Sequence, residues 1–258
     1  RIPFLHKEKF ISENRQIPHK NIRFQSSLSA YIPGVSGALV VSDDFGGHIM
    51  AINTPVLKLF RTAYSANDLP NYFGNNRIDL EGFGPDDLNT GKTGLDYLQW
   101  MEEGDHVFSY ELITPPGTDK FALMREDLKR YFPHIEAHIE NRKRTIWAMV
   151  KTGTGDFPPS TGAKTHYDVG PMGIKVTNSR LQGFVYYLNL YFMQDSPYPV
   201  MDRTGIDYPI DFEVDARLSD LESLRGGLQR IGLDLELREE EIPVLVLKKK
   251  FTDNQSQP

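Results

Sequence analysis

A short polar segment followed by a helical stripe occurs twice in this chain, and this repetition limits the folds that it can adopt. Residues 52–56 (Ile-Asn-Thr-Pro-Val) introduce the first stripe, and residues 177–181 (Thr-Asn-Ser-Arg-Leu) introduce the second. Apolar residues then recur at i, i+3, i+4 and i+7, which is the spacing of one helix face. They are Val56, Leu59, Phe60 and Ala63 in the first stripe, and Leu181, Phe184, Val185 and Leu188 in the second. The sequence therefore predicts two similar small units, with Thr54 as the N-cap of the first helix.

The other predicted elements follow in the same order in both halves. Alternating apolar residues indicate strands, and a further stripe with helical spacing indicates a second helix in each half. The strands are expected at 77–81 and 108–112 in the first half and around Val200 and at 210–214 in the second, with helices through 121–131 and 221–231. We expect an α+β fold of two tandem related strand-helix-strand-strand-helix-strand-strand units, in one sheet or in two.

Each half is predicted to end in a β-hairpin, which supplies the last two strands of the unit. Residues 135–139 and 145–150 form the hairpin of the first half, and residues 233–237 and 243–247 form that of the second. The charged runs Arg142-Lys143-Arg144 and Glu239-Glu240-Glu241 lie between or beside these strands and are interpreted as solvated hairpin ends.

Composition shifts divide the chain into segments. The first repeat unit carries an insertion at 82–106, where Gly, Pro, Asp and Asn separate two strands that only a short turn separates in the second half. The predicted segments are a linker or arm at 1–35, the first unit at 36–152, a linker at 153–172, the second unit at 173–250 and a tail at 251–258.

Composition and charge argue against several classes of function. The 29 basic and 35 acidic residues give a net charge of -6, which does not favour binding to nucleic acid. The absence of cysteine excludes a catalytic thiol, a thiolate zinc site and a disulfide framework. No apolar stretch approaches the ~20 residues of a membrane span. The chain begins at Arg1 without Met, which leads us to expect that a signal peptide or a preceding domain was removed.

The chain resembles a family of uncharacterised exported proteins of soil and environmental bacteria. Its halves resemble the short N-terminal domain of secretins and TonB-dependent receptors. The segments that carry the resemblance are 49–64, 123–150, 199–205 (Pro-Val-Met-Asp-Arg-Thr-Gly), 210–214, 233–237 and 243–247, which together span most of the chain from about 36 to 248. The insertion at 82–106 departs from the usual pattern of that domain.

The resemblance implies export to the periplasm or cell envelope, and in some relatives a region like this follows a thioredoxin-like domain. It supplies no catalytic residues. A protein partner in the cell envelope is therefore expected, and no cofactor.

Two polar patterns invite a catalytic or metal-binding interpretation, and neither is favoured. His134 and His138 alternate with Glu136 and Glu140 on one face of a predicted strand, so the two histidines lie about 13 Å apart and cannot share an ion. Only a helix would bring them together. Adjacent carboxylates such as Asp86 and Asp87 are normally solvated, so a hydrolase is the least expected class and no catalytic or metal-binding residue is predicted.

Aromatic residues give the best indication of a ligand site. They surround the helix at 181–188 and its exit, and core packing explains most of them. The alternative is a surface for a partner or ligand, because Tyr and Trp are enriched at recognition sites. The candidate ligand-binding residues are Tyr97, Trp100, Tyr187 and Tyr191. The predicted function is an exported, non-catalytic interaction or accessory module; the alternative is a small-molecule or peptide binder with a groove beside 82–106.

Overall fold

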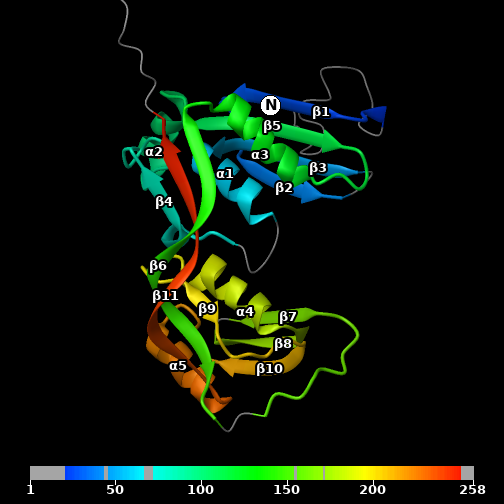
Figure 1. Cartoon of the computed structure of the whole chain (residues 1–258), viewed down its shortest axis with the longest axis vertical. Coiled ribbons are helices and arrows are strands. Elements are labelled where there is room, and N and C mark those ends of the chain that lie inside the picture. Colours follow the sequence, from blue (N-terminus) through cyan, green and yellow to red (C-terminus); the bar gives the residue numbers. More distant parts are fainter. Residues whose placement is uncertain (1–20, 44–45, 67–71, 154–155, 171, 251–258) are drawn as a thin grey trace, which may run out of the picture. The chain divides into compact units, whose positions relative to one another are not determined.

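The computed structural model describes residues 21–43, 46–66, 72–153, 156–170 and 172–250 (Figure 1). Over this described part the fold is α+β, with five α-helices and eleven strands in three sheets. The chain forms two compact units. Unit 1 consists of the described residues of Arg1–Ala66, Leu80–Ala137 and Leu247–Pro258, and unit 2 of those of Asn67–Asp79 and His138–Val246.

Unit 1 is built on an antiparallel sheet covered on one face by two helices that also contact each other. The strands are β1 (Gln25–Ala30), β2 (Ala38–Ser42), β3 (Gly47–Pro55) and β5 (Val107–Thr114), in the order β1-β5-β3-β2. The helices that pack on it are α1 (Val56–Ser65) and α3 (Lys120–Tyr131). A third helix, α2 (Gly94–Glu102), lies within the predicted insertion between β4 (Ile78–Glu81) and β5.

The first predicted stripe forms the buried face of α1, as its spacing requires. Leu59 and Ala63 are fully buried, and the preceding strand β3 is buried along almost all of its length. Thr54 does not cap this helix, because its hydroxyl donates to the Ile52 carbonyl at 3.1 Å and the helix begins after Pro55. Asn53 takes a left-handed conformation, with φ 44°, where the register between β3 and β5 shifts.

Unit 2 also contains an antiparallel sheet with helices packed against it. The strands are β7 (His166–Gly170), β8 (Gly173–Ser179) and β10 (Ile210–Asp215), in the order β10-β8-β7. Helix α4 (Leu181–Tyr187) contacts β8 and the short strand β9 (Val200–Asp202), and α5 (Leu221–Arg230) contacts β10. Asn178 is left-handed, with φ 49°, and the register between β10 and β8 shifts beside it.

The two predicted hairpins are wrong, because a single long strand replaces each of them. Strand β6 (Ile135–Lys151) and strand β11 (Leu233–Lys249) are each 17 residues long and belong to a sheet with the order β4-β11-β6-β9. The charged runs lie inside these strands and not at turns. The two runs face each other with opposite charges, since Lys143 Nζ lies 2.7 Å from Glu239 Oε2. Neither run contains the Gly or Pro that a turn favours.

Two segments predicted as linkers contain strands. Strand β1 falls within 1–35 and β7 within 153–172, and both lie at the edge of their sheets. Edge strands can carry short, polar and half-exposed sequences, which lack the alternation that identifies a strand. Three of the four boundaries between the compact units fall inside β4, β6 and β11, whereas the predicted repeat boundaries fall between elements.

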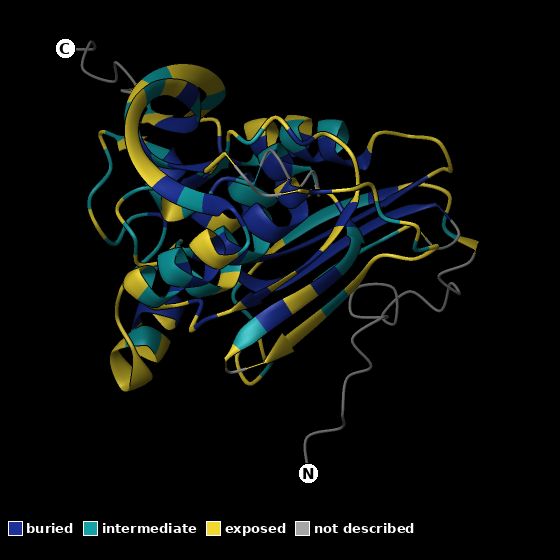
Figure 2. Ribbon diagram, turned by 90° about the horizontal axis from the view of Figure 1, so that it is seen from below, coloured by how far each residue is buried: buried dark blue, intermediate teal, exposed yellow. Residues whose placement is uncertain are grey.

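The apolar residues of both stripes are used for packing. In Figure 2 dark blue marks the buried strands and helix faces, and yellow lies on loops, on outer helix turns and on parts of some strands. The core of unit 2 includes Leu181, Phe184 and Leu188, all fully buried, together with Leu224 and Leu228 of α5. Asp220 caps α5 by accepting a hydrogen bond from the Ser223 amide at 2.7 Å.

Candidate functional site

The helix that begins at Leu181 changes its geometry after about two turns. Residues Leu188–Phe192 form a π-helix, η5, in which the Met193 amide donates to the Leu188 carbonyl at 2.7 Å, five residues back. Such segments are rare, occur mostly as single turns within α-helices, and are frequently found at functional sites. The widened turn in unit 2 therefore marks a place to look for a binding site.

The side chain that holds this turn is Asn189. Its Nδ2 donates to the Val200 carbonyl at 2.8 Å and to the Val185 carbonyl at 3.0 Å, and its Oδ1 accepts from the Val200 amide at 2.9 Å. The carboxamide thus pairs with both backbone groups of a fully buried residue of β9. This pairing ties the helix to the strand that follows it.

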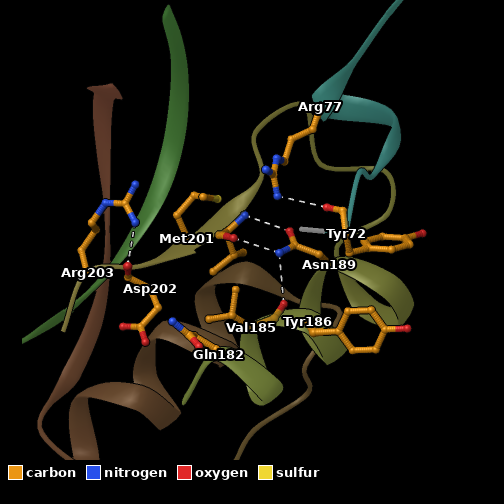
Figure 3. A pocket seen from close by; sticks show the side chains of 10 residues that line it. Tyr72, Arg77, Gln182, Val185, Tyr186, Asn189, Met201, Asp202 and Arg203 are labelled. Carbon is orange, nitrogen blue, oxygen red and sulfur yellow. Dashed lines mark hydrogen bonds between the residues drawn. The ribbon is translucent and has the colours of Figure 1, made fainter. Parts of the chain in front are cut away.

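A small cavity lies beside this junction, entirely within unit 2 (Figure 3). Its volume is about 110 Å³. Pockets for drug-sized ligands measure roughly 300 Å³ or more, so this one has room for a small molecule or for one group of a larger ligand. The lining residues are Tyr72, Arg77, Gln182, Val185, Tyr186, Asn189, Val200, Met201, Asp202 and Arg203.

The cavity wall contains one buried guanidinium. Arg77 is 4% exposed, and its Nε and Nη2 both donate to the Pro243 carbonyl at 3.1 Å, while Nη1 donates to the Tyr72 carbonyl at 3.0 Å. Burial lowers the pKa of Arg77 to about 10, and the nearby charge of Arg203 contributes to this shift. The side chain therefore remains a cation at neutral pH.

The second group of charges lies on the turn that follows β9. Arg203 Nε donates to Glu240 Oε2 at 2.8 Å, and its Nη1 donates to the Asp202 carbonyl at 2.7 Å. Asp202 Oδ1 accepts from the Thr204 amide at 2.9 Å and from the Thr204 hydroxyl at 2.8 Å, and Gly205 completes the turn with φ 74°. These bonds fix the direction of the Asp202 side chain.

Tyrosine rings form a connected group around the same helix. Tyr186 meets Tyr72 edge to face at 5.4 Å, and Tyr187 lies 5.5 Å from Tyr191 and stacks on Tyr167 at 4.5 Å between centroids. We call these five residues the tyrosine surface. Tyr191 is 58% exposed, whereas burial raises the pKa of Tyr186, with smaller contributions from neighbouring tyrosines. The group thus joins the cavity wall to an exposed aromatic side chain.

Of the four predicted ligand-binding residues, Tyr187 and Tyr191 lie together on the tyrosine surface, and the other two belong to unit 1. Trp100 is 4% exposed, stacks on Tyr97 at 5.7 Å and on His106 at 5.0 Å, and donates its indole N–H to the Asp86 carbonyl at 2.8 Å. These contacts give Trp100 a packing role in a small cluster. A ligand-binding role for Tyr97 and Trp100 stays a prediction.

Of the residues weighed for metal binding, Glu136, His138 and Glu140 lie on β6, and His134 directly precedes this strand. His138 contacts Glu140 at 3.2 Å on β6. Among the residues that the structure describes, no three His, Asp or Glu side chains are placed to hold a metal ion. No helix in the described ranges has the length and apolar character needed to cross a membrane.

Sequence reasoning missed two buried polar clusters in unit 1. Asp127 is 2% exposed and accepts from the Tyr110 hydroxyl at 2.8 Å and from the Ser26 hydroxyl at 2.5 Å. Glu111 is fully buried and contacts His48 at 3.1 Å and Gln25 at 2.9 Å. Both clusters join residues far apart in the chain, so no local pattern indicates them.

Comparisons with known proteins do not add to this geometry. No protein-family model, curated protein or solved structure matches the chain. The cavity and the tyrosine surface of unit 2 are therefore the candidates for a functional site.

Proposed function

We propose that the chain is a non-catalytic interaction module whose recognition surface is the tyrosine surface of unit 2. The observation that carries the proposal is the exposure of Tyr191 on a π-helical turn, beside Tyr187. Tyrosine is enriched at the centres of protein interfaces, because a ring offers large apolar contact at a low entropy cost and a hydroxyl for hydrogen bonding. A contiguous group of rings offers a partner more contact area than a single ring does.

The polar groups around the cavity support binding in preference to turnover. Asn189 and Arg203 are engaged in hydrogen bonds that hold η5, β9 and β11 in place, which makes them scaffold. A preformed wall of this kind reduces the ordering that a partner must impose on binding.

We also infer that the two halves of the chain arose by duplication. The order in the first half of the chain is β3, α1, β4, β5, α3 and β6, and in the second half it is β8, α4, β9, β10, α5 and β11. Asn53 and Asn178 occupy the same place in the two introducers, have φ 44° and 49°, and lie at register shifts. Non-glycine residues rarely adopt this conformation, so its recurrence supports common descent.

The resemblance to the short N-terminal domain of secretins and TonB-dependent receptors leads us to propose export to the periplasm or cell envelope. The partner would then be a protein of that compartment. Association with a thioredoxin-like domain in the complete protein is part of the same proposal.

Comparative capture tests the recognition surface. The wild-type chain and Tyr191→Ser would be immobilised and exposed to envelope extract, with quantitative mass spectrometry of the retained proteins. Leu237→Ser is the matched control, because Leu237 belongs to unit 2, is 53% exposed and lies on β11. A protein retained by the wild type and by Leu237→Ser but lost with Tyr191→Ser supports the proposal. Equal retention by all three would contradict it.

The cavity favours a second candidate function, the binding of a small molecule. This differs in place from the predicted groove beside 82–106, since the cavity lies in unit 2 and that segment in unit 1. The groove stays a prediction, and deletion of 82–106 with retention of ligand-induced stabilisation would count against it.

A further inference from the structure

We infer that the exposed side of α2 in unit 1 is a docking surface for a basic amphipathic helix of a protein partner. The surface consists of Leu95 and Leu98 with the carboxylates that flank them, Asp96, Glu102 and Glu103. We call it the α2 surface. The inference goes beyond the proposed function, because the tyrosine surface belongs to unit 2 and the α2 surface to unit 1.

Two leucines are exposed on one face of α2. Leu95 is 82% exposed, which is the highest value for a large apolar side chain in the described part of the chain, and Leu98 is 46% exposed. Residues three apart lie next to each other on a helix, so the two side chains form one apolar patch. A single exposed apolar residue needs no explanation, but neighbouring leucines on one helix face offer a partner apolar area to bury.

The opposite side of α2 anchors the helix in unit 1. Trp100 is 4% exposed and donates its indole N–H to the Asp86 carbonyl at 2.8 Å. It also stacks on Tyr97 and on His106. Met101 is 9% exposed and packs with Trp100 in the same cluster. The helix cannot turn its leucines inward without exposing Trp100, so unit 1 presents them in a fixed direction.

The charges around the leucines are acidic, and the nearby lysines are paired with other carboxylates. Lys92 Nζ lies 3.2 Å from Asp86 Oδ2, and Lys249 Nζ lies 3.6 Å from Asp87 Oδ2. Within the described part of the chain, the carboxylates beside the leucines form no ion pair; they are those of Asp96, Glu102 and Glu103. A positively charged partner would therefore meet unmatched carboxylates beside the apolar patch.

Glu102 and Glu103 lie at the end of α2 where a negative charge is least favourable. The C-terminal end of a helix carries a partial negative charge, so lysine or arginine is stabilising there and glutamate is not. The last turn of α2 contains no basic residue. A cation from a partner would relieve this repulsion, which makes a basic ligand complementary to this end of the helix.

A basic amphipathic helix matches the apolar and the acidic part of the surface together. Its apolar stripe would cover Leu95 and Leu98, and lysine or arginine at the border of the stripe would meet the carboxylates. An anionic lipid surface, which exposed leucines alone could enter, is repelled by the same carboxylates. Because α2 has nine residues, the contact is short, and we expect a weak, transient complex.

Fluorescence anisotropy with a labelled model peptide tests the inference. The probe is a helix of leucine and lysine, about 18 residues long, with all its leucines on one face. The matched peptides are a scramble of the same composition and a version with glutamate in place of lysine. At physiological salt we expect saturable binding of the leucine–lysine helix to the wild-type chain, and roughly tenfold weaker binding of both matched peptides.

Variants of the chain test the two parts of the surface separately. Leu95→Ser should weaken binding roughly tenfold, as loss of a central contact does. Its control is Leu39→Ser, because Leu39 is an exposed leucine of unit 1 on β2. Glu102→Lys should weaken binding of the leucine–lysine helix and strengthen that of the leucine–glutamate helix, without lowering the melting temperature, since lysine suits this end of α2. Glu136→Lys makes the same change of charge at an exposed position of unit 1 on β6 and is its control.

Several results would overturn the inference. They are the absence of saturable binding, equal binding of the scrambled peptide, equal affinity of Leu95→Ser and Leu39→Ser, and equal affinity of Glu102→Lys and Glu136→Lys. Dimerisation of the chain in sedimentation that is lost with Leu95→Ser would assign the surface to a second copy instead. Binding of anionic vesicles that is lost with Leu95→Ser would assign it to a membrane, and either result would overturn the partner inferred for α2.

Discussion

Replacement of Asn189 by leucine should destabilise unit 2 more than is usual for a residue on a partly exposed helix. The substitution removes three hydrogen bonds and leaves the amide and carbonyl of fully buried Val200 without the partner that Asn189 provides. An ordinary hydrogen bond contributes about 1 kcal/mol, and a buried group left unsatisfied costs about 1 to 3 kcal/mol. We therefore expect a loss of about 3 kcal/mol, or roughly 6 to 12 °C in melting temperature for a chain of this size.

The assay is thermal unfolding followed by far-ultraviolet and near-ultraviolet circular dichroism. The near-ultraviolet signal should also weaken, because η5 holds Tyr187 and Tyr191 in their packed arrangement. Gln182→Leu is the matched control, since it replaces an exposed carboxamide of α4 at the same cavity and should change stability by less than about 0.5 kcal/mol. Asn189→Leu with the stability of Gln182→Leu would refute the idea that this carboxamide sustains the π-helix.

Two further predictions concern other polar groups. Tyr110→Phe should lower the free energy of unfolding in urea by about 1 to 3 kcal/mol, because it removes a hydrogen bond to the buried carboxylate of Asp127. Tyr131→Phe loses only a contact to the Ser26 hydroxyl and should cost less. The reverse order would contradict the role of Asp127. Burial raises the pKa of Asp234, but hydrogen bonds from Arg225, Gln229 and its neighbour's amide outweigh this and lower it. Because the pKa of this carboxyl group is lower in the folded than in the unfolded state, the carboxylate stabilises the folded protein at pH values above its unfolded-state pKa. This contribution should be lost as the pH falls below about 4, and Asp234→Asn should reduce the dependence of stability on acid pH.

The helices were the most predictable elements, because their signal is local. The predicted helix at 121–131 corresponds to α3 (Lys120–Tyr131), and that at 221–231 to α5 (Leu221–Arg230). Each has an apolar face of regular spacing and an Asp at its N-cap. In these segments tertiary packing favours the same helical conformation as the local sequence, so the apolar spacing alone is enough to predict the helix.

The long strands could not be predicted, because what keeps them extended is not local. The runs 142–144 and 239–241 carry charges that suit a turn in an isolated hairpin. In the structure Lys143 faces Glu239, and Arg142 and Arg144 both contact Asp79, so pairing with other strands satisfies them in place. A reader of one sequence sees the charges but not their partners.

The cavity was missed for the same reason. Its lining comes from residues 72–77, 182–189 and 200–203, and no single segment has a recognisable motif for binding. The Asp-Arg-Thr-Gly turn at 202–205 contributes to the resemblance but does not by itself predict a cavity. What could have indicated the site is the polar Asn189 within the apolar and aromatic run 184–192, where a polar residue needs a partner.

The first helix of each half differs in geometry at matching positions. The position of Tyr64 in unit 1 corresponds to that of Asn189 in unit 2, counted from Asn53 and Asn178. Helix α1 remains a regular α-helix there, and the Tyr64 hydroxyl donates to the Ala137 carbonyl at 2.7 Å. Unit 2 instead has a carboxamide that binds β9 and widens the helix. A regular helix would satisfy packing alone, so the widened turn at Asn189 is the feature to which the proposed recognition surface is tied, and Asn189→Leu should disturb that surface as well as stability.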